Sequence, residues 1–262
     1  MSRDVRHLAS ISASRIRALP DRAWAPVVLL TGAIEQHGPH LPVAFDALIA
    51  QVWIERILAR LPADATCYVA PSITIGKSNE HIGFPGTLTI SQETLRGQIH
   101  AIARQLAQWG FRQLAVLNTH GGNSGVLGYT LRELEPLFGL RATRLTHAPE
   151  TGLSPQEATY GFHAGEVETS WLLAAAPSLV RPHLGTCEYP AHLSDPGELR
   201  PEDAPATFAW ASQDVSRSGV MGDATAASAE KGARWIEQRV DGYVAQIVAL
   251  ADQGRRRIAA DA

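Results

Sequence analysis

The sequence is poor in cysteine, in long apolar runs and in excess charge of either sign. Only two cysteines, Cys67 and Cys187, occur in 262 residues, which is too few for a disulfide framework and fits a reducing compartment. No apolar run approaches the roughly 18 residues of a membrane-spanning helix, and residues 1–7 contain no apolar core of signal-peptide type. These absences argue against a disulfide-stapled fold and a membrane span, and we expect a cytoplasmic protein.

The charge balance argues against two classes of partner. The formal net charge is −3, and neither basic nor acidic residues gather into a run that would follow a nucleic-acid backbone or an anionic membrane. With 45% hydrophobic and 19% charged residues, the chain can bury a large core in one unit. We therefore expect a single domain over residues 1–262, with its core in about residues 25–250, and no nucleic-acid or membrane partner.

Short apolar runs alternate with segments of helical periodicity. The run 25–34 is almost continuously apolar, which is the pattern of a strand buried on both faces. The other predicted strands are 67–75, 87–90, 113–118 and 140–146, and the predicted helices are 46–60, 92–109, 124–138, 165–176 and 225–252. Strands separated by helices imply right-handed crossovers, so the sequence predicts an α/β protein, a three-layer α/β/α fold with a mainly parallel central sheet.

Two segments near the C-terminus lack this periodicity. Segment 181–220 is predicted to be a long loop or a pair of short edge strands, and loops of such length are usually functional. We expect this one to cover a site or to meet another subunit. The arginines at 255–257 are predicted to form a solvated tail.

Glu35 and His37 stand two residues apart at the carboxyl end of the first predicted strand. In an extended chain both side chains point to one side, and this edge of a parallel sheet is where α/β proteins hold ligands. Two metal ligands would converge there, although an exposed loop pair with no role is the alternative.

Asp46 opens the next predicted helix. An aspartate at this position commonly caps free backbone N–H groups. The short loop from His37 would also let its carboxylate return to the same edge of the sheet, where it would bridge two ions.

His120 lies in the stretch 118–123, directly after the third long apolar run, so it reaches the same edge of the sheet as Glu35. Gly121 and Gly122 allow a tight turn and a close approach of the backbone to a ligand. A phosphate-cradling loop is the rival interpretation, but the stretch matches neither a Walker loop nor a dinucleotide fingerprint.

The stretch 163–170 contains His163, Glu166 and Glu168. Acids in a first helical turn are favoured by the helix dipole whatever the function, and a single histidine before a helix is ordinary. Taken with the earlier clusters, however, these side chains complete an N/O ligand set suited to Zn²⁺ or Mn²⁺.

Several ordered stretches resemble the signature blocks of the creatininase (creatinine amidohydrolase) family. They are 32–42, 80–87, 118–123, 163–170, 219–223 and 226–232. The resemblance covers about residues 25–250. It implies a creatininase-like three-layer α/β fold with a dinuclear metal site, often in a hexameric assembly.

By match of motif, the resemblance assigns ligands to two divalent ions. Glu35 and His120 would hold one ion, His37 the other, and Asp46 would bridge them. We expect Zn²⁺ first, while Mn²⁺ and Fe²⁺ accept the same ligands.

One departure from the family pattern concerns the second ion. Creatininases carry a glutamate ligand two residues after the strand histidine, where this sequence has Gly122. Glu168, the acid of the 163–170 block, is our candidate to replace it. The Gly122 form also looks like other branches of the family, including formamide-cleaving deformylases and the peptidase that trims a mycofactocin precursor.

The resemblance also suggests catalytic and substrate-binding residues. His163 corresponds to the histidine near the scissile bond, and we count Glu168 with it as catalytic. Ser78, Glu80 and His81 lie where the family places a substrate-contacting loop. His163 would protonate the departing nitrogen, because an amide anion leaves poorly.

The implied function is a metal-dependent amidohydrolase that cleaves a C–N bond of a small amide, such as a cyclic amide or a formamide, with water activated by two ions. The alternatives are a metal-dependent peptidase that trims a peptide C-terminus and a non-catalytic small-molecule-binding homologue. We expect a small-molecule amide substrate and a homo-oligomer. Tyr189, His192, Phe208 and Trp210 would help to form either a closed pocket or a peptide groove.

Overall fold

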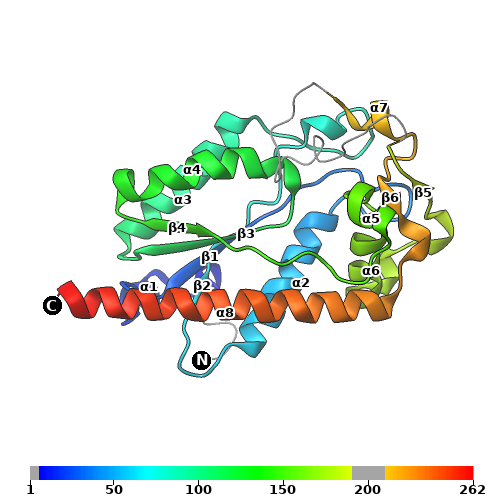
Figure 1. Cartoon of the computed structure of the whole chain (residues 1–262). Helices are drawn as coiled ribbons and strands as arrows, with labels where there is room; N and C mark the ends of the chain where they lie inside the picture. Colours follow the sequence, from blue (N-terminus) through cyan, green and yellow to red (C-terminus); the bar gives the residue numbers. More distant parts are fainter. Residues whose placement is uncertain (1–5, 191–209, 262) are drawn as a thin grey trace.

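A four-stranded parallel sheet with the strand order β2-β1-β3-β4 lies at the centre of the protein (Figure 1). β1 (Pro26–Thr31) pairs with β3 (Gln113–Asn118) along its whole length, while β2 (Tyr68–Val69) and β4 (Arg141–Arg144) are the short edge strands. Every residue of β1 is buried, as expected for a strand covered on both faces.

This computed structural model describes residues 6–190 and 210–261. His192 and Phe208, which we expected to help shape the site, lie outside the described residues. None of the helices in these ranges is both long and apolar enough to cross a bilayer. The shortest elements are α1 (Ala13–Arg17) and the 3₁₀ turns Leu8–Ser10, Asn79–His81, Gly121–Asn123, Pro177–Leu179, Pro182–Leu184 and Ala224–Ala226.

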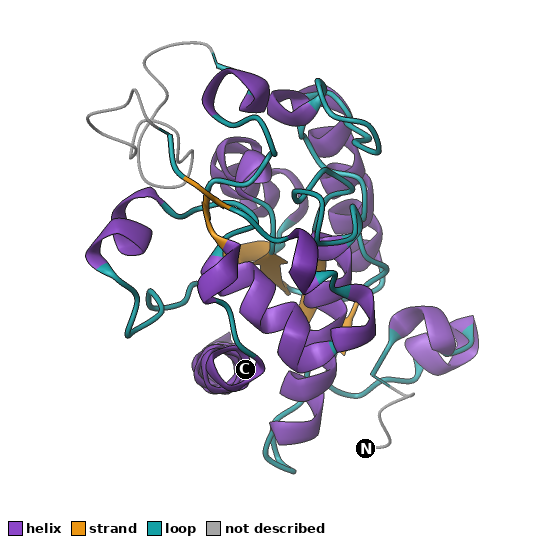
Figure 2. Ribbon diagram, turned by 90° about the vertical axis from the view of Figure 1, so that its right-hand side faces the viewer, coloured by secondary structure: helices purple, strands orange, loops and turns teal. Residues whose placement is uncertain are grey.

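Helices cover both faces of the main sheet (Figures 1 and 2). α2 (Phe45–Arg60) and α8 (Ala229–Asp261) pack on one face, and α3 (Gln92–Gln108) and α4 (Ser124–Phe138) pack on the other. Each face has its own hydrophobic core, in which a fully buried leucine or isoleucine contributes about 1.5–3 kcal/mol. The predicted three-layer α/β/α fold with a parallel sheet is confirmed.

The predicted strands 67–75 and 87–90 are largely replaced by irregular chain. The first pairs as a strand only over β2, because Pro71 has no backbone N–H with which to continue the ladder. Ile73 then returns to β1 through an isolated bridge. The second predicted strand is reduced to a single bridge at Leu88.

The arginines at 255–257 are part of a helix, where Arg256 and Arg257 are exposed as predicted but Arg255 makes side-chain contacts. α8 begins four residues after the predicted start at 225 and continues to Asp261. The Arg255 guanidinium lies 4.2 Å from the Trp24 ring and donates to the Asp252 carboxylate at 2.7 Å. Arg255 is therefore held against Trp24 and Asp252, which the local sequence pattern did not indicate.

A group of small elements lies beyond the main sheet, at the right of Figure 1. β5 (Cys187–Glu188) and β6 (Gly222–Asp223) form an antiparallel pair, so an edge strand does occur within segment 181–220. The helices here are α5 (Pro155–Tyr160), α6 (Glu166–Ala175) and α7 (Ser212–Val215). Of these elements, α5 and α6, with the loop that joins them, line one wall of the site described next.

Candidate metal centre

Four of the predicted ligands meet at the carboxyl edge of the main sheet. Glu35 and His37 follow β1, Asp46 is the second residue of α2, and His120 follows β3. All four residues are buried, so the exposed-loop interpretation of Glu35 and His37 is wrong. The capping interpretation of Asp46 is also wrong, because the N-cap of α2 is Ala44 and no side chain caps this helix.

The first group of ligand atoms comes from Glu35, Asp46 and His120. His120 Nδ1 lies 3.2 Å from Glu35 Oε1 and 3.4 Å from Asp46 Oδ2. His120 Nε2 lies 2.9 Å from the carbonyl oxygen of Lys77, to which it donates its proton. Nδ1 is the atom turned towards the two carboxylates, as in a metal-binding histidine whose other nitrogen is held by the backbone.

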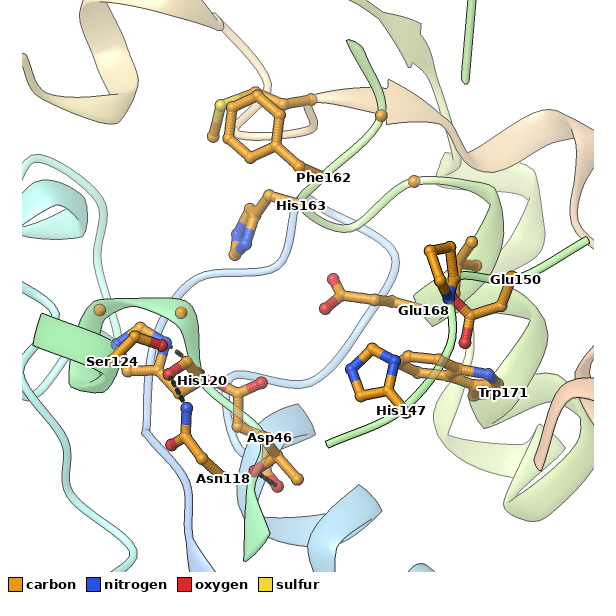
Figure 3. Close-up of a pocket in the computed structure, with 18 of the residues that line it drawn as sticks. Asp46, Asn118, His120, Ser124, His147, Glu150, Phe162, His163, Glu168 and Trp171 are labelled. Carbon is orange, nitrogen blue, oxygen red and sulfur yellow. Dashed lines mark hydrogen bonds and ion pairs between the residues drawn. The ribbon is translucent and has the colours of Figure 1, made fainter. Parts of the chain in front are cut away.

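The second group comes from His37, Asp46 and Glu168. His37 Nε2 lies 3.7 Å from Asp46 Oδ1 and 3.7 Å from Glu168 Oε2, while its Nδ1 donates to the carbonyl oxygen of Glu35 at 3.2 Å. The N–H of Ala164 donates to Glu168 Oε2 at 2.7 Å. Figure 3 shows Glu168 entering from the side opposite His120, with Asp46 below.

The donors fit two divalent cations that share Asp46. The ligand atoms of each group lie within 4.8 Å of one another, and two donors on one ion at about 2.0–2.2 Å lie up to about 4.4 Å apart. Glu35 Oε2 and Asp46 Oδ2 are buried and form no hydrogen bond with the described residues. Such oxygens are costly unless a cation satisfies them.

Without a cation, the buried side chains of the two ligand groups hold protons more tightly than usual. Burial, together with the neighbouring charge of Glu35, raises the pKa of Asp46 to about 7, and burial next to Asp46 raises the pKa of Glu168 to about 8. For His120, burial opposes the charged form, but the attraction of Glu35 and Asp46 prevails and raises its pKa well above the usual value. Protons therefore occupy positions that a metal ion would take, and metal binding would release them.

The stability of the metal-free protein is expected to fall as the pH rises from 7 to 9. In this range the folded state binds more protons than the unfolded state, because the folded pKa values of Asp46, Glu168 and His120 are all raised. The rise in melting temperature on adding Zn²⁺ to chelator-treated protein should accordingly be larger at pH 9 than at pH 7. Equal shifts in thermal unfolding at the two pH values would contradict this linkage.

His163 and His81 stand beside the two groups that share Asp46, and His163 forms a third group of possible ligand atoms with Glu35 and His37. His163 Nδ1 and His81 Nε2 lie 3.8 and 3.7 Å from Glu35 Oε1, and the two rings stack with their centroids 4.3 Å apart. Backbone hydrogen bonds with Met221 hold His163 in place. Burial lowers the pKa of His163 and lowers that of His81 to about 3, so both rings are neutral at pH 7.

Ser78 and Glu80 flank His120 in different ways. Ser78 is fully buried, with its hydroxyl 3.1 Å from His120 Nε2. Glu80 fills the space beside Gly122, where an added Cβ would lie 2.5 Å from Glu80 Oε1 and 2.3 Å from the carbonyl oxygen of Lys77. A side chain at position 122 is therefore excluded by this packing. Contact of substrate with Ser78, Glu80 and His81 stays a prediction.

Glu157 was not recognised from the sequence, because a glutamate in a short helix gives no signal. It is 2% exposed and accepts hydrogen bonds from Glu166 N, Asp223 N and Tyr189 Oη, each at 2.9 Å. It thereby joins the start of α6 to β6 and to the chain after β5. Tyr189, expected at the site, serves this junction.

Replacing Glu157 with alanine is expected to lower the free energy of unfolding by about 3 kcal/mol, because each buried donor left unpaired costs roughly 1–3 kcal/mol. Tyr189→Phe removes one of the three bonds and should cost only about 1 kcal/mol. Denaturant titration of both variants measures the difference. Similar small losses would show that the junction does not depend on Glu157.

A cavity of about 500 Å³ opens from the ligand groups. Its wall away from them includes Trp53, His147, Trp171, Trp210 and Arg239. The Arg239 guanidinium lies 4.3 Å from the Trp171 ring and 5.1 Å from the Trp53 ring. A pocket of this volume is typical of sites that bury a whole small ligand. Figure 3 shows Trp171 and His147 next to Glu168.

The family model described as creatininase, creatinine amidohydrolase, matches residues 9–247. The chain belongs to the creatininase family. It is 33% identical over 229 residues to a mycofactocin precursor peptide peptidase of Mycolicibacterium smegmatis, covering 86% of this chain and 85% of the relative. It is 30% identical over 236 residues to the creatinine amidohydrolase of Pseudomonas putida, covering 82% of this chain and 86% of the relative.

Solved creatininases share the fold. A mutant creatininase of the Zn–Zn type superposes with a TM-score of 0.74 at 26% identity, over 94% of this chain and 98% of that structure. The match confirms the predicted family and architecture. Since relatives act on different substrates, membership alone does not select one for this chain.

Proposed function

We propose that this member of the creatininase family is a hydrolase of amide C–N bonds that works with two divalent ions. Zn²⁺ is the first candidate, and Mn²⁺ and Fe²⁺ suit the same donors. One observation carries the proposal: the buried carboxylate of Asp46 belongs to two groups of N/O ligands at once. Glu35 and His120 complete one group, and His37 and Glu168 complete the other.

The protein's own residues supply the remaining chemistry. When bound, the ions would lower the pKa of water and polarise the substrate carbonyl. His163 is neutral and its Nδ1 lies 3.8 Å from Glu35 Oε1, so its lone pair can accept the proton that the attacking water loses and donate it to the departing nitrogen as the C–N bond breaks. The backbone N–H of Ala164 orients Glu168 towards His37.

A small amide is the substrate class we propose first, and a peptide is the second. The family model and the similarity to a creatinine amidohydrolase support the first class. The cavity of about 500 Å³, which exceeds what a small cyclic amide needs, and the similarity to peptidases at 33% identity support the second. Rates with peptides of two to five residues would separate them. A rate that rises with length indicates a peptidase, whereas preference for lactams or formamides indicates a small-molecule amidohydrolase.

Turnover by metal-reconstituted protein tests the proposal itself. Chelator-treated protein would be loaded in turn with Zn²⁺, Mn²⁺ and Fe²⁺ and assayed against lactams, formamides and short peptides. We expect metal-dependent cleavage of at least one class. Absence of turnover from protein with both ions bound would favour the non-catalytic homologue. A homo-oligomer also stays a proposal, which light scattering would test.

A further inference from the structure

The side chain of Gln36 lies between the two stacked histidines of the site. It is buried, and its Nε2 lies 2.9 Å from His81 Nδ1 and 3.0 Å from His163 Nε2. Gly219 leaves room for it, since an added Cβ there would lie 2.0 Å from Gln36 Oε1. Gln36 lies between the predicted ligands Glu35 and His37, and nothing in the sequence indicates a role for its side chain.

Two backbone groups fix the orientation of the Gln36 amide. The N–H of Gly38 donates to Oε1 at 2.9 Å, so this atom must be the oxygen. Nε2 donates to the carbonyl oxygen of Gly219 at 3.0 Å, which uses one of its two hydrogens. One N–H remains for the histidines.

The remaining N–H can serve only one ring. His163 Nε2 lies 2.8 Å from the backbone carbonyl oxygen of Gln36, which only accepts, so this nitrogen carries the proton of His163. The Gln36 N–H must therefore donate to His81 Nδ1. The hydroxyl of Ser212, 2.7 Å from the same nitrogen, can rotate to donate as well.

The two neutral rings then face the ligand groups with opposite hydrogen-bonding character. His81 presents a protonated Nε2, and His163 presents an unprotonated Nδ1. Both atoms are directed at the same carboxylate oxygen, Glu35 Oε1, at distances too long for a hydrogen bond. Both residues also line the cavity.

We propose that His81 is a further catalytic residue, a hydrogen-bond donor to the substrate oxygen that gains negative charge, and that Gln36 positions it by fixing its tautomer. This assignment deepens the proposed amide hydrolysis and rests on it. It separates two tasks: His81 stabilises developing charge, while His163 accepts and returns a proton. Removing one such donor typically lowers kcat about 10²- to 10³-fold.

Substitutions at His81 test the donor role. His81→Leu should lower kcat about 10²- to 10³-fold with metal content unchanged. His81→Gln keeps an N–H near the position of Nε2 and should recover at least about tenfold of that loss. The assay uses the panel substrate that the wild type cleaves fastest, and His100→Gln, outside the site, is the matched control. Equal inactivity of the Leu and Gln variants, or full activity of the Leu variant, would overturn the assignment.

Nitrogen-15 NMR of histidine-labelled, zinc-loaded protein tests the tautomer without any substrate. The His81 signals are assigned by their absence from the spectrum of His81→Gln. In the wild type they should show the proton on Nε2. Gln36→Met should weaken that preference, and Gln36→Met combined with Ser212→Ala should abolish it, because the Ser212 hydroxyl can also donate to Nδ1. A proton on Nδ1 of His81 in the wild type would refute the role of Gln36 even if amides are cleaved, and the expected tautomer in an inactive protein would refute only the proposed function.

Discussion

Asp46→Asn is expected to remove most of both metal ions from the protein. An asparagine keeps the size of the side chain but loses the negative charge, and Asp46 is the residue common to both ligand groups. Loss of a residue that only hydrogen-bonds to a metal ligand typically lowers metal affinity 10- to 100-fold. We therefore expect a larger decrease in metal affinity when a ligand shared by both ions is replaced. Metal analysis after gel filtration would give well below one ion per chain, with activity lost in parallel.

Glu168→Gln provides the contrast, because Glu168 belongs to one group only. We expect about one ion to remain, held by Glu35, Asp46 and His120. Asp64→Asn makes the same substitution at an exposed aspartate and is the control for replacing an aspartate by an asparagine. If Asp46→Asn and Glu168→Gln lost equal amounts of metal, Asp46 would not be the bridging ligand.

His163→Ala is expected to keep its metal and to lose turnover about 10²- to 10⁴-fold, as is typical when a general acid–base group is removed. The ring contributes to neither of the groups that share Asp46. His120→Ala should instead lose metal, because His120 Nδ1 faces both Glu35 and Asp46. Kinetics and metal analysis of both variants would be compared with His183→Ala, which alters an exposed residue.

Two outcomes would contradict these roles. Normal turnover by His163→Ala would exclude proton transfer by this ring. Loss of metal from the same variant would instead make His163 a ligand, which the third group of ligand atoms, Glu35, His37 and His163, would allow.

Local patterns in the sequence predicted the elements that carry most of the site. The bounds of β3 and α4 agree with the predicted strand 113–118 and helix 124–138, because a continuous apolar run and a helical repeat are local signals. Glu35, Asp46 and His120 stand at the ends of such elements. Their convergence followed from a general property of parallel sheets, whose carboxyl ends share an edge.

Irregular segments escaped prediction for a physical reason. α5 is only six residues long, and Glu157 within it acts through backbone groups far away in the sequence. The conformation of Ala164, with φ of 54°, is uncommon for any residue but glycine, and composition does not reveal it. Such features depend on the packing of several segments at once.

The sequence by itself determined the layered fold, the family and the side chains that could bind metal, because all of these depend on periodicity and on short motifs. Only the tertiary structure decided that Glu168 faces His37, that Glu80 occupies the space beside Gly122, and that Gln36 joins two histidines. Each of these contacts spans more than 40 residues, so its geometry arises from how the loops pack over the sheet.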